Sequence, residues 1–231
     1  MRTVLLREAV RATPRTHVLR LDVSGAPFTF RAGQAVMAGL PDSDTRSAYS
    51  IASPPSWALR GRIELLVPSD GAFGEAGLDP GSVVGHWLAI DGPIGALGVP
   101  AEAQRAPLLL VGGGTGISPL RSVALDRLER ADAPPMVLVY SARTPDEFAF
   151  GEELAALDRR GQLRVHTTVT RDERAGVWPG RSGRIDDALL SAALPGSEAW
   201  CLVCGPAGFV DAVIASLEGL GVPGGRIIVE R

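Results

Sequence analysis

The chain has 231 residues, enough for one large domain or for two domains of roughly 100 to 130 residues each. Its net charge is −3, so it has no excess of basic residues to bind a nucleic acid, and we expect no nucleic-acid partner. All 23 basic residues are arginine, which excludes lysine Schiff-base chemistry and the Gly-Lys-Ser/Thr phosphate loop.

The first hundred residues carry a pattern of short strands separated by turns. Between His17 and Val23, apolar and polar residues alternate, which is typical of a half-buried strand. Segments rich in glycine, proline, serine and aspartate separate this strand from its neighbours. Further strands are expected at 34–40, 48–52, 62–67 and 83–90. Short strands at this spacing predict an antiparallel β-barrel over residues 1–100.

After Pro100 the pattern changes, and apolar strands alternate with helical segments. The first strand, Leu108–Val111, ends in glycines. Later strands are expected at 136–140, 164–170, 199–203 and 226–229, and helices at 119–131, 145–160, 185–193 and 207–220. This alternation predicts a doubly wound parallel sheet in an α/β domain over residues 101–231, with the junction near Val99–Ala106. The expected fold class is therefore β + α/β.

Cys201 and Cys204 are the two cysteines, and they form a C-x-x-C pair inside an apolar run. Side chains three residues apart in a strand point to opposite faces, so a local disulfide has poor geometry. Two thiolates cannot supply the about four ligands of a zinc or iron–sulfur site, and we expect no metal centre.

The sequence also gives an expectation about location. The N-terminal residues contain no signal-peptide core, and the longest apolar stretch, from Pro107 to Val111, is too short to span a bilayer. We therefore expect a cytoplasmic protein without a membrane partner.

The strongest local motif is a cluster of glycines at 112–116, between a buried strand and a helix. Glycines let the backbone approach a diphosphate, while the start of the helix supplies N–H donors and the positive end of its dipole. The G-x-G-x-x-G spacing is not met, because Ile117 stands at the third glycine position. A second turn, Cys204-Gly205-Pro206, also follows a strand. Ligands collect beyond the carboxyl ends of parallel strands, so both turns are expected to border one crevice.

Four segments, in this order, resemble the motifs of the ferredoxin–NADP⁺ reductase superfamily, and the resemblance covers essentially the whole chain. The segment from Arg46 to Ser50 resembles the family's flavin motif, Arg-x-Tyr-Ser/Thr. Residues 112–119 resemble its nucleotide motif, Gly-Gly-x-Gly-Ile-x-Pro, and residues 204–206 its Cys-Gly-Pro motif. Asp91–Gly95 resembles its Gly-Pro-x-Gly loop.

The resemblance implies a flavin-dependent NAD(P)H oxidoreductase with an FAD-binding barrel and an NAD(P)-binding domain. Hydride would pass from NADPH to bound FAD, and electrons would pass on to a separate acceptor: a ferredoxin, an oxygenase component or a small molecule. The resemblance assigns three catalytic positions: Tyr49 against the isoalloxazine ring, Ser50 at flavin N5 and Cys204 beside the nicotinamide C4. It assigns cofactor binding to Arg46, Tyr49, Ser50 and Ile51, to Gly71, Ala72, Phe73 and Gly74 at the flavin diphosphate, to Gly113, Gly114, Thr115 and Gly116 at the nucleotide diphosphate, and to Cys204, Gly205 and Pro206.

Three features depart from the family pattern. Arg46 lies three residues before Tyr49 instead of two, so a role at the flavin phosphate requires a bulge or a bend. Gly74 and Glu75 stand where the family often has a serine or threonine near the diphosphate. Many relatives also have an aromatic residue at or near the C-terminus, over the outer face of the flavin, whereas here no aromatic residue follows Glu230. Two interpretations of Glu230 stay open: a carboxylate on the surface, or a carboxylate at the flavin. The first two departures leave room for a flavin reductase that uses flavin as a substrate, and a non-catalytic redox subunit is the other alternative.

The residues after two of the parallel strands favour NADPH over NADH. An NAD-selective site offers a carboxylate to the adenosine ribose, but the segment Tyr140–Thr144 contains no acid. Arg143 in this segment, and Arg171 after the next strand, can make charge-assisted bonds to a 2′-phosphate. The alternative is that both are solvated loop residues, in which case NADH would serve as well.

Overall fold

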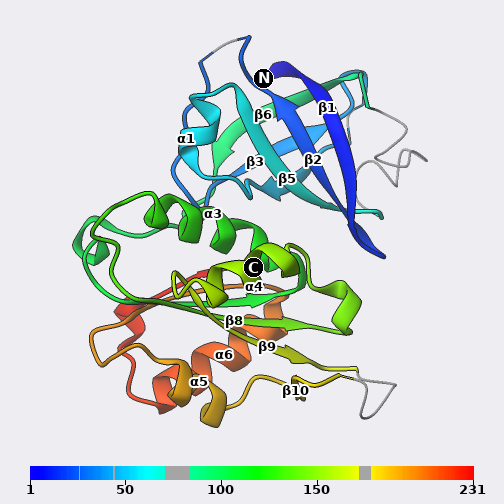
Figure 1. Cartoon of the computed structure of the whole chain (residues 1–231). Coiled ribbons are helices and arrows are strands. Elements are labelled where there is room, and N and C mark those ends of the chain that lie inside the picture. The colour runs from blue at the N-terminus through cyan, green and yellow to red at the C-terminus, as the bar shows by residue number, and fades with distance from the viewer. Residues whose placement is uncertain (26, 44, 71–83, 172–177) are drawn as a thin grey trace.

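The computed structural model describes residues 1–25, 27–43, 45–70, 84–171 and 178–231. They form two six-stranded sheets, one antiparallel and one parallel, which confirms the expected fold class. Figure 1 shows the two sheets one above the other, with helix α3 (Ile117–Leu128) lying between them.

The antiparallel sheet curls into a barrel that is not fully closed. Its strands are β1 (Arg2–Thr13), β2 (Thr16–Asp22), β3 (Ala35–Gly39), β4 (Ser47–Ser50), β5 (Arg62–Pro68) and β6 (Trp87–Ile94), in the order β4-β3-β6-β1-β2-β5. The outer strands β4 and β5 meet through an isolated bridge between Ile51 and Leu65. Alternate residues of the strands, such as Leu19 and Leu21 of β2, point inward and form the barrel core.

Two elements of this half were not expected from the sequence. Strand β1 contains register shifts between Leu6 and Glu8 and between Arg11 and Thr13, so its alternation of apolar and polar residues slips twice. The short helix α1 (Pro55–Ala58) starts at a proline that the sequence pattern indicates only as a turn.

The parallel sheet is doubly wound, as predicted. Its strands are β7 (Leu108–Gly113), β8 (Met136–Ala142), β9 (Arg164–Val169), β10 (Arg181–Ser182), β11 (Trp200–Cys204) and β12 (Ile227–Glu230), in the order β10-β9-β8-β7-β11-β12. Helices α3 and α4 (Gly151–Arg159) pack on one face, and α5 (Asp187–Ala193) and α6 (Ala207–Gly219) on the other. The strand order reverses between β7 and β11, and this switch point is where α/β sheets bind ligands.

The helix expected at 145–160 is broken, and in that respect the prediction was wrong. A 3₁₀ turn covers Pro145–Glu147, and α4 begins only at Gly151. Between them Phe150 takes a left-handed conformation with φ 58°. Its ring lies 4.2 Å from the guanidinium carbon of Arg121, a tertiary contact that no local pattern shows.

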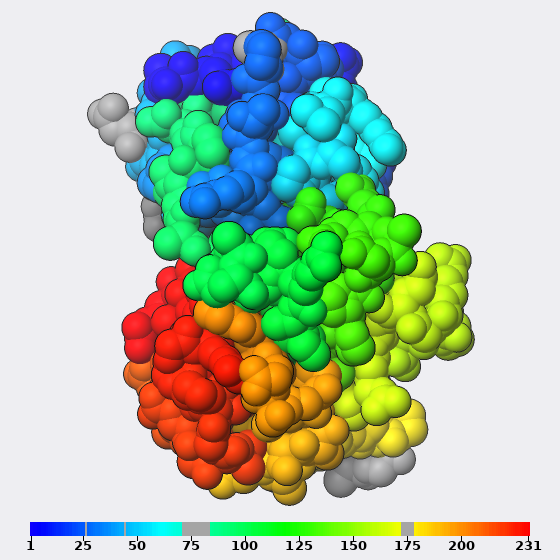
Figure 2. Space-filling model, turned by 90° about the vertical axis from the view of Figure 1, so that its left-hand side faces the viewer, coloured from blue at the N-terminus to red at the C-terminus, as the bar shows by residue number. Residues whose placement is uncertain are grey.

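The two sheets are joined by the segment from Ile94, the end of β6, to Leu108, the start of β7. Figure 2 shows the chain around residues 95–130, in green, spreading across the junction between the two halves. A domain boundary between residues 100 and 101 falls inside this connection and stays a prediction. Within the ranges described, no helix is both long enough and apolar enough to cross a membrane.

Candidate flavin and nucleotide site

The two glycine-containing turns lie side by side at the switch point. Gly112 at the end of β7 pairs with Cys204 at the end of β11. A Cβ on Gly116 would lie 2.2 Å from the carbonyl oxygen of Cys204, and one on Gly205 would lie 2.7 Å from the Phe209 ring. The turns can approach this closely because neither carries a side chain there. Both border one cleft, as predicted: its lining includes Gly113, Gly114, Thr115 and Pro206.

The start of helix α3 has the features of a diphosphate site. No side chain caps its N-terminus and no acidic residue lies in its first turn, so no protein side chain takes the place of an anion there. The amide of Ile117 donates to the carbonyls of Gly114 and Thr115, so the amides left for an anion belong to the preceding turn, where Gly114 and Thr115 are exposed. Gly114 has φ 58° and open space where its Cβ would stand. The buried Tyr140 hydroxyl donates to the carbonyl of Gly114 at 3.1 Å and accepts from the amide of Ala149 at 3.2 Å. Tyr140 thus fixes the turn from the side of the sheet, while the space at Gly114 is open, and this arrangement fits a nucleotide diphosphate.

The cleft has a volume of about 720 Å³ and takes its walls from both halves of the chain. Thr13, Leu66 and Pro68 line it from the barrel, opposite the glycine turn. A cleft with walls from both sheets can hold a nucleotide between the diphosphate turn and the barrel.

Three arginines line the cleft at the ends of neighbouring strands. Arg143 follows β8 and Arg171 follows β9, and the amide of Arg171 donates to the carbonyl of Arg143 at 2.7 Å. Arg184 follows β10 and was not expected from the sequence, because that strand has two residues and gives no pattern. Across the described ranges none of the three forms an ion pair. Arg15, also in the cleft, pairs with Glu147 at 2.9 Å.

The proposed flavin strand, β4, lies at the edge of the barrel. Tyr49 is 5% exposed and belongs to the barrel core, while Ser50 is half-buried and points the other way. Ile51 is fully buried beside it. The strand therefore presents Ser50 to a ligand more openly than Tyr49, and stacking of Tyr49 on the flavin ring stays a prediction.

Arg46 lies just before β4, outside the regular strand, so the alternation that argued against its phosphate role does not apply to it. Its Nε is buried and has no hydrogen-bond partner among the residues described. A buried guanidinium nitrogen without a partner fits a position that binds a phosphate. The other expected flavin-diphosphate residues, Gly71, Ala72, Phe73 and Gly74, lie outside the described residues.

The C-terminal strand links the flavin strand to the nicotinamide turn. Ser50 pairs with Ala35 of β3, and Cys204 pairs with Glu230 of β12. Glu230 Oε1 lies 3.2 Å from the position that a Cβ on Gly95 would take, and the amide nitrogen of Ala35 lies 3.8 Å from the same point. Glu230 therefore connects the strand next to Cys204 with the barrel segment at Ala35, the residue that pairs with Ser50. Neither Ser50 nor Cys204 is among the residues that line the cleft.

Glu230 is half-buried and lies beside Gly95 of the barrel, whereas a place at the flavin stays a prediction. Burial raises the pKa of Glu230, and its Oε2 has no hydrogen-bond partner among the described residues. A carboxyl group in this setting holds its proton to a higher pH than an exposed glutamate does.

The two cysteines are buried free thiols on opposite sides of the parallel sheet: Cys201 packs with α5 and α6, and Cys204 with α3 and α4. Burial raises the pKa of both thiols to about 12, and the charge of Glu230 adds to the effect at Cys204. In the described ranges, no three histidine, cysteine or acidic side chains gather as a metal site.

We expect neither thiol of the folded chain to react with a maleimide at pH 8, because the thiolate is the reactive form. Since unfolded thiols ionise near pH ~8.5, the free energy of unfolding should fall as the pH rises from there toward 12. Mass spectrometry after labelling measures the first effect, with both thiols modified in urea as the control. Fast labelling of the native chain would contradict it.

The comparisons with known proteins agree with this fold. The model of the oxidoreductase NAD-binding domain family matches residues 110–214. The ferredoxin–NAD⁺ reductase component of the alkene monooxygenase system of Xanthobacter autotrophicus is 34% identical, over 97% of this chain and 68% of that protein. Ferredoxin–NADP reductase B of Sorangium cellulosum is 32% identical, over 90% of this chain and 87% of that protein. A ferredoxin–NADP⁺ reductase from Neisseria gonorrhoeae, solved with bound FAD and NADP, superposes with a TM-score of 0.79 at 21% identity, over 99% of this chain and 97% of that one.

An antiparallel barrel joined to a doubly wound sheet, together with the match to the NAD-binding domain family and the reductase relatives, defines a pyridine-nucleotide-dependent oxidoreductase. The chain belongs to the ferredoxin–NADP⁺ reductase superfamily. It is an NAD(P)H oxidoreductase.

Proposed function

We propose that this chain takes hydride from NADPH onto FAD bound at the barrel and delivers the electrons to a separate ferredoxin or oxygenase component. The observation that carries the proposal is the contact that Glu230, the strand partner of Cys204, makes with the barrel beside Ala35, the strand partner of Ser50. Hydride transfer requires the nicotinamide C4 and the flavin N5 to be aligned at about 3 to 3.5 Å. A site with walls from both halves can provide that alignment.

The roles of the residues follow from their positions. FAD supplies the chemistry of accepting hydride and releasing electrons, and the protein supplies binding and alignment. The Ser50 hydroxyl donates a hydrogen bond at flavin N5, and Arg46 holds a flavin phosphate. The N–H groups at Gly114, Thr115 and Gly116 hold the nucleotide diphosphate, while Cys204 shapes the nicotinamide pocket as a neutral thiol.

Relatives support the choice of acceptor. The two reductases reported above are named for ferredoxin, and the reductase component of phenol 2-monooxygenase from Pseudomonas is 32% identical over 83% of this chain and 54% of that protein. The names of these three relatives have in common that the reductase works with a separate protein, which we propose as the acceptor here.

The experiment that tests the function is an absorbance measurement. The purified chain, supplied with FAD, should keep the flavin through gel filtration. Without oxygen, NADPH should bleach the flavin absorbance band at ~450 nm. Both results are expected of a flavin bound next to the nucleotide cleft. Adding a [2Fe–2S] ferredoxin should restore the colour. Flavin that is lost on the column but reduced in solution would support a flavin reductase, and failure of both nucleotides to bleach it would overturn the proposal.

Replacing Ser50 by alanine should slow flavin reduction by about tenfold or more, because it removes a hydrogen bond at the atom that receives hydride. The fold should be unaffected, since Ser50 is half-buried on an edge strand. Stopped-flow bleaching at saturating NADPH measures the rate. Ser47→Ala, three residues earlier in the same strand, is the matched control, and equal rates in the two variants would count against the role of Ser50.

A further inference from the structure

Helix α3 makes two hydrogen bonds to the chain segment that directly follows β4, the proposed flavin strand. The Arg121 side chain, 5% exposed, donates from Nη1 to the carbonyl of Ala52 at 2.8 Å. The next residue, Ser122, is fully buried and donates to the carbonyl of Ser53 at 2.7 Å. Ala52 and Ser53 come two and three residues after Ser50. Two successive residues of one helix therefore hold two successive carbonyls of the flavin segment.

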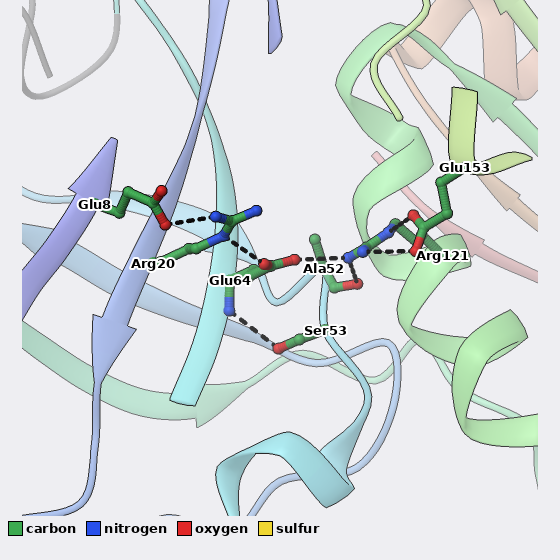
Figure 3. A network of polar contacts seen from close by, with 7 residues as sticks. All are labelled: Glu8, Arg20, Ala52, Ser53, Glu64, Arg121 and Glu153. Atoms are coloured by element: carbon green, nitrogen blue, oxygen red, sulfur yellow. Dashed lines mark hydrogen bonds and ion pairs between the residues drawn. The ribbon is translucent and has the colours of Figure 1, made fainter. Parts of the chain in front are cut away.

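Charged side chains hold Arg121 in place from both halves of the chain, as Figure 3 shows. Arg121 Nη1 also donates to Glu64 of β5 at 3.0 Å, and its Nε and Nη2 contact the carboxylate of Glu153 on α4 at 2.5 and 3.1 Å. Glu64 is 3% exposed, and its second oxygen accepts from Arg20 of β2 at 2.9 Å. The network thus runs from the barrel through Arg121 to the parallel sheet's helices.

The same helix begins at the glycine turn that we assign to the nucleotide diphosphate. An α-helix rises 1.5 Å per residue and is stiff over such a length. Helix α3 therefore connects the nucleotide turn at its start to the flavin segment at its middle, with no loop between the two contacts. Buried groups that are fully hydrogen-bonded rigidify their surroundings, whereas removing one partner leaves the others unsatisfied.

We propose that Arg121 is a positioning residue for hydride transfer: by holding the carbonyl of Ala52 and the carboxylates of Glu64 and Glu153, it fixes the flavin strand relative to the nucleotide turn. Arg121 is not among the residues that line the cleft, and this inference rests on the proposed function. Misalignment by about 1 Å from a distant change can slow such a reaction by up to about 100-fold.

The test compares two arginines that share one carboxylate. Arg121→Met removes the contacts that Arg121 makes with the barrel, whereas Arg20→Met removes the other partner of Glu64 and leaves α3 untouched. Three quantities are measured on the FAD-loaded chain: the rate of bleaching at saturating NADPH, the rate of reduction by dithionite, and the dissociation constant of NADP⁺. Hydrogen–deuterium exchange of residues 47–58 and 117–128 is followed on the chain with and without FAD.

We expect Arg121→Met to slow bleaching by about tenfold while dithionite reduction and NADP⁺ binding stay within about twofold. Exchange in both segments should accelerate, and Arg20→Met should match the wild type in every readout. Bleaching and exchange in Arg121→Met that equal the wild type would overturn the proposal, as would an equal slowing in Arg20→Met. If Arg121→Met does not fold, Ser122→Ala takes its place, with about fivefold slower bleaching expected for the loss of one hydrogen bond; an unchanged rate there overturns the proposal too.

Failure of the proposed function would look different. A wild-type chain that neither NADPH nor NADH can bleach would overturn the function and with it the role in hydride transfer. The exchange measurement would then still decide whether Arg121 holds the two halves together, because it needs no nucleotide.

Discussion

Replacing Gly116 by alanine is expected to destabilise the chain by about 3 kcal/mol and to lower nucleotide-dependent flavin reduction by more than about 100-fold. The added Cβ would lie 2.2 Å from the carbonyl oxygen and 2.5 Å from the carbonyl carbon of Cys204, and 2.8 Å from the amide nitrogen of Gly205. All three are backbone atoms where β11 ends and its turn begins, so they cannot move aside as a flexible side chain can. The two turns must separate, and both turns border the cleft that we propose holds the nucleotide.

A matched control for this variant is Gly219→Ala, in the last turn of α6. No atom lies within 4 Å of the Cβ that it would add, and Gly219 has no positive φ. Alanine there should leave activity unchanged and stability equal or higher by about 0.5 kcal/mol, since glycine is the poorer helix former. Urea unfolding gives the stability and stopped-flow bleaching the rate. A Gly116→Ala variant that behaves like the control would show that the two turns do not need their close approach.

The parts of the fold that could be predicted from the sequence are those encoded by local runs. The buried strand before the glycine cluster is apolar throughout, as a strand covered on both faces must be, and β7 is indeed buried from Leu108 to Gly113. The turn after it, and the turn at Cys204, could be placed at one edge because parallel strands end at the same side. The pairing of Gly112 with Cys204 bears this out.

The elements that sequence patterns missed are those shaped by contacts with distant residues. The bulges of β1 shift its register against β2, so a strand of 12 residues shows no steady alternation. The break before α4 depends on Phe150, whose ring packs against Arg121 from another helix. A sequence window of ten residues therefore shows neither the register shifts of β1 nor the break before α4.

The candidate site shows the same division. Ser50, Cys204 and the glycine turn stand in recognisable motifs, but Arg121 lies in the helix expected at 119–131, where an arginine between apolar residues is ordinarily a surface residue. Its burial depends on carboxylates at 64 and 153, which only the packing of the two halves brings together. A single arginine in an otherwise apolar helix face is only weak evidence for a buried ion pair. It becomes informative once the structure shows which carboxylates lie next to it.

The second large effect is expected at the adenosine end of the cleft, where Arg143 and Arg171 should confer a preference for NADPH. The backbone bond between them holds the ends of β8 and β9 together, so both guanidinium groups start from adjacent positions. Neither has an ion pair among the described residues, and a phosphate dianion can satisfy both. A hydrogen bond to a charged group contributes about 1.5 to 3 kcal/mol, which corresponds to at least about tenfold in affinity for each arginine.

We therefore expect wild-type kcat/KM to be higher with NADPH than with NADH. Arg143→Ala and Arg171→Ala should each lower the NADPH value by about tenfold, and the double variant by about 100-fold, with the NADH value within about threefold of the wild type. Arg184→Ala should act in the same direction, because Arg184 lines the same cleft. Arg160→Ala, which removes an exposed arginine at the end of α4 outside the cleft, controls for the change in net charge. Steady-state kinetics with both nucleotides decides the matter: a wild type equally or more efficient with NADH would refute the preference, and equal losses with both nucleotides would assign the arginines to the shared diphosphate instead of the 2′-phosphate.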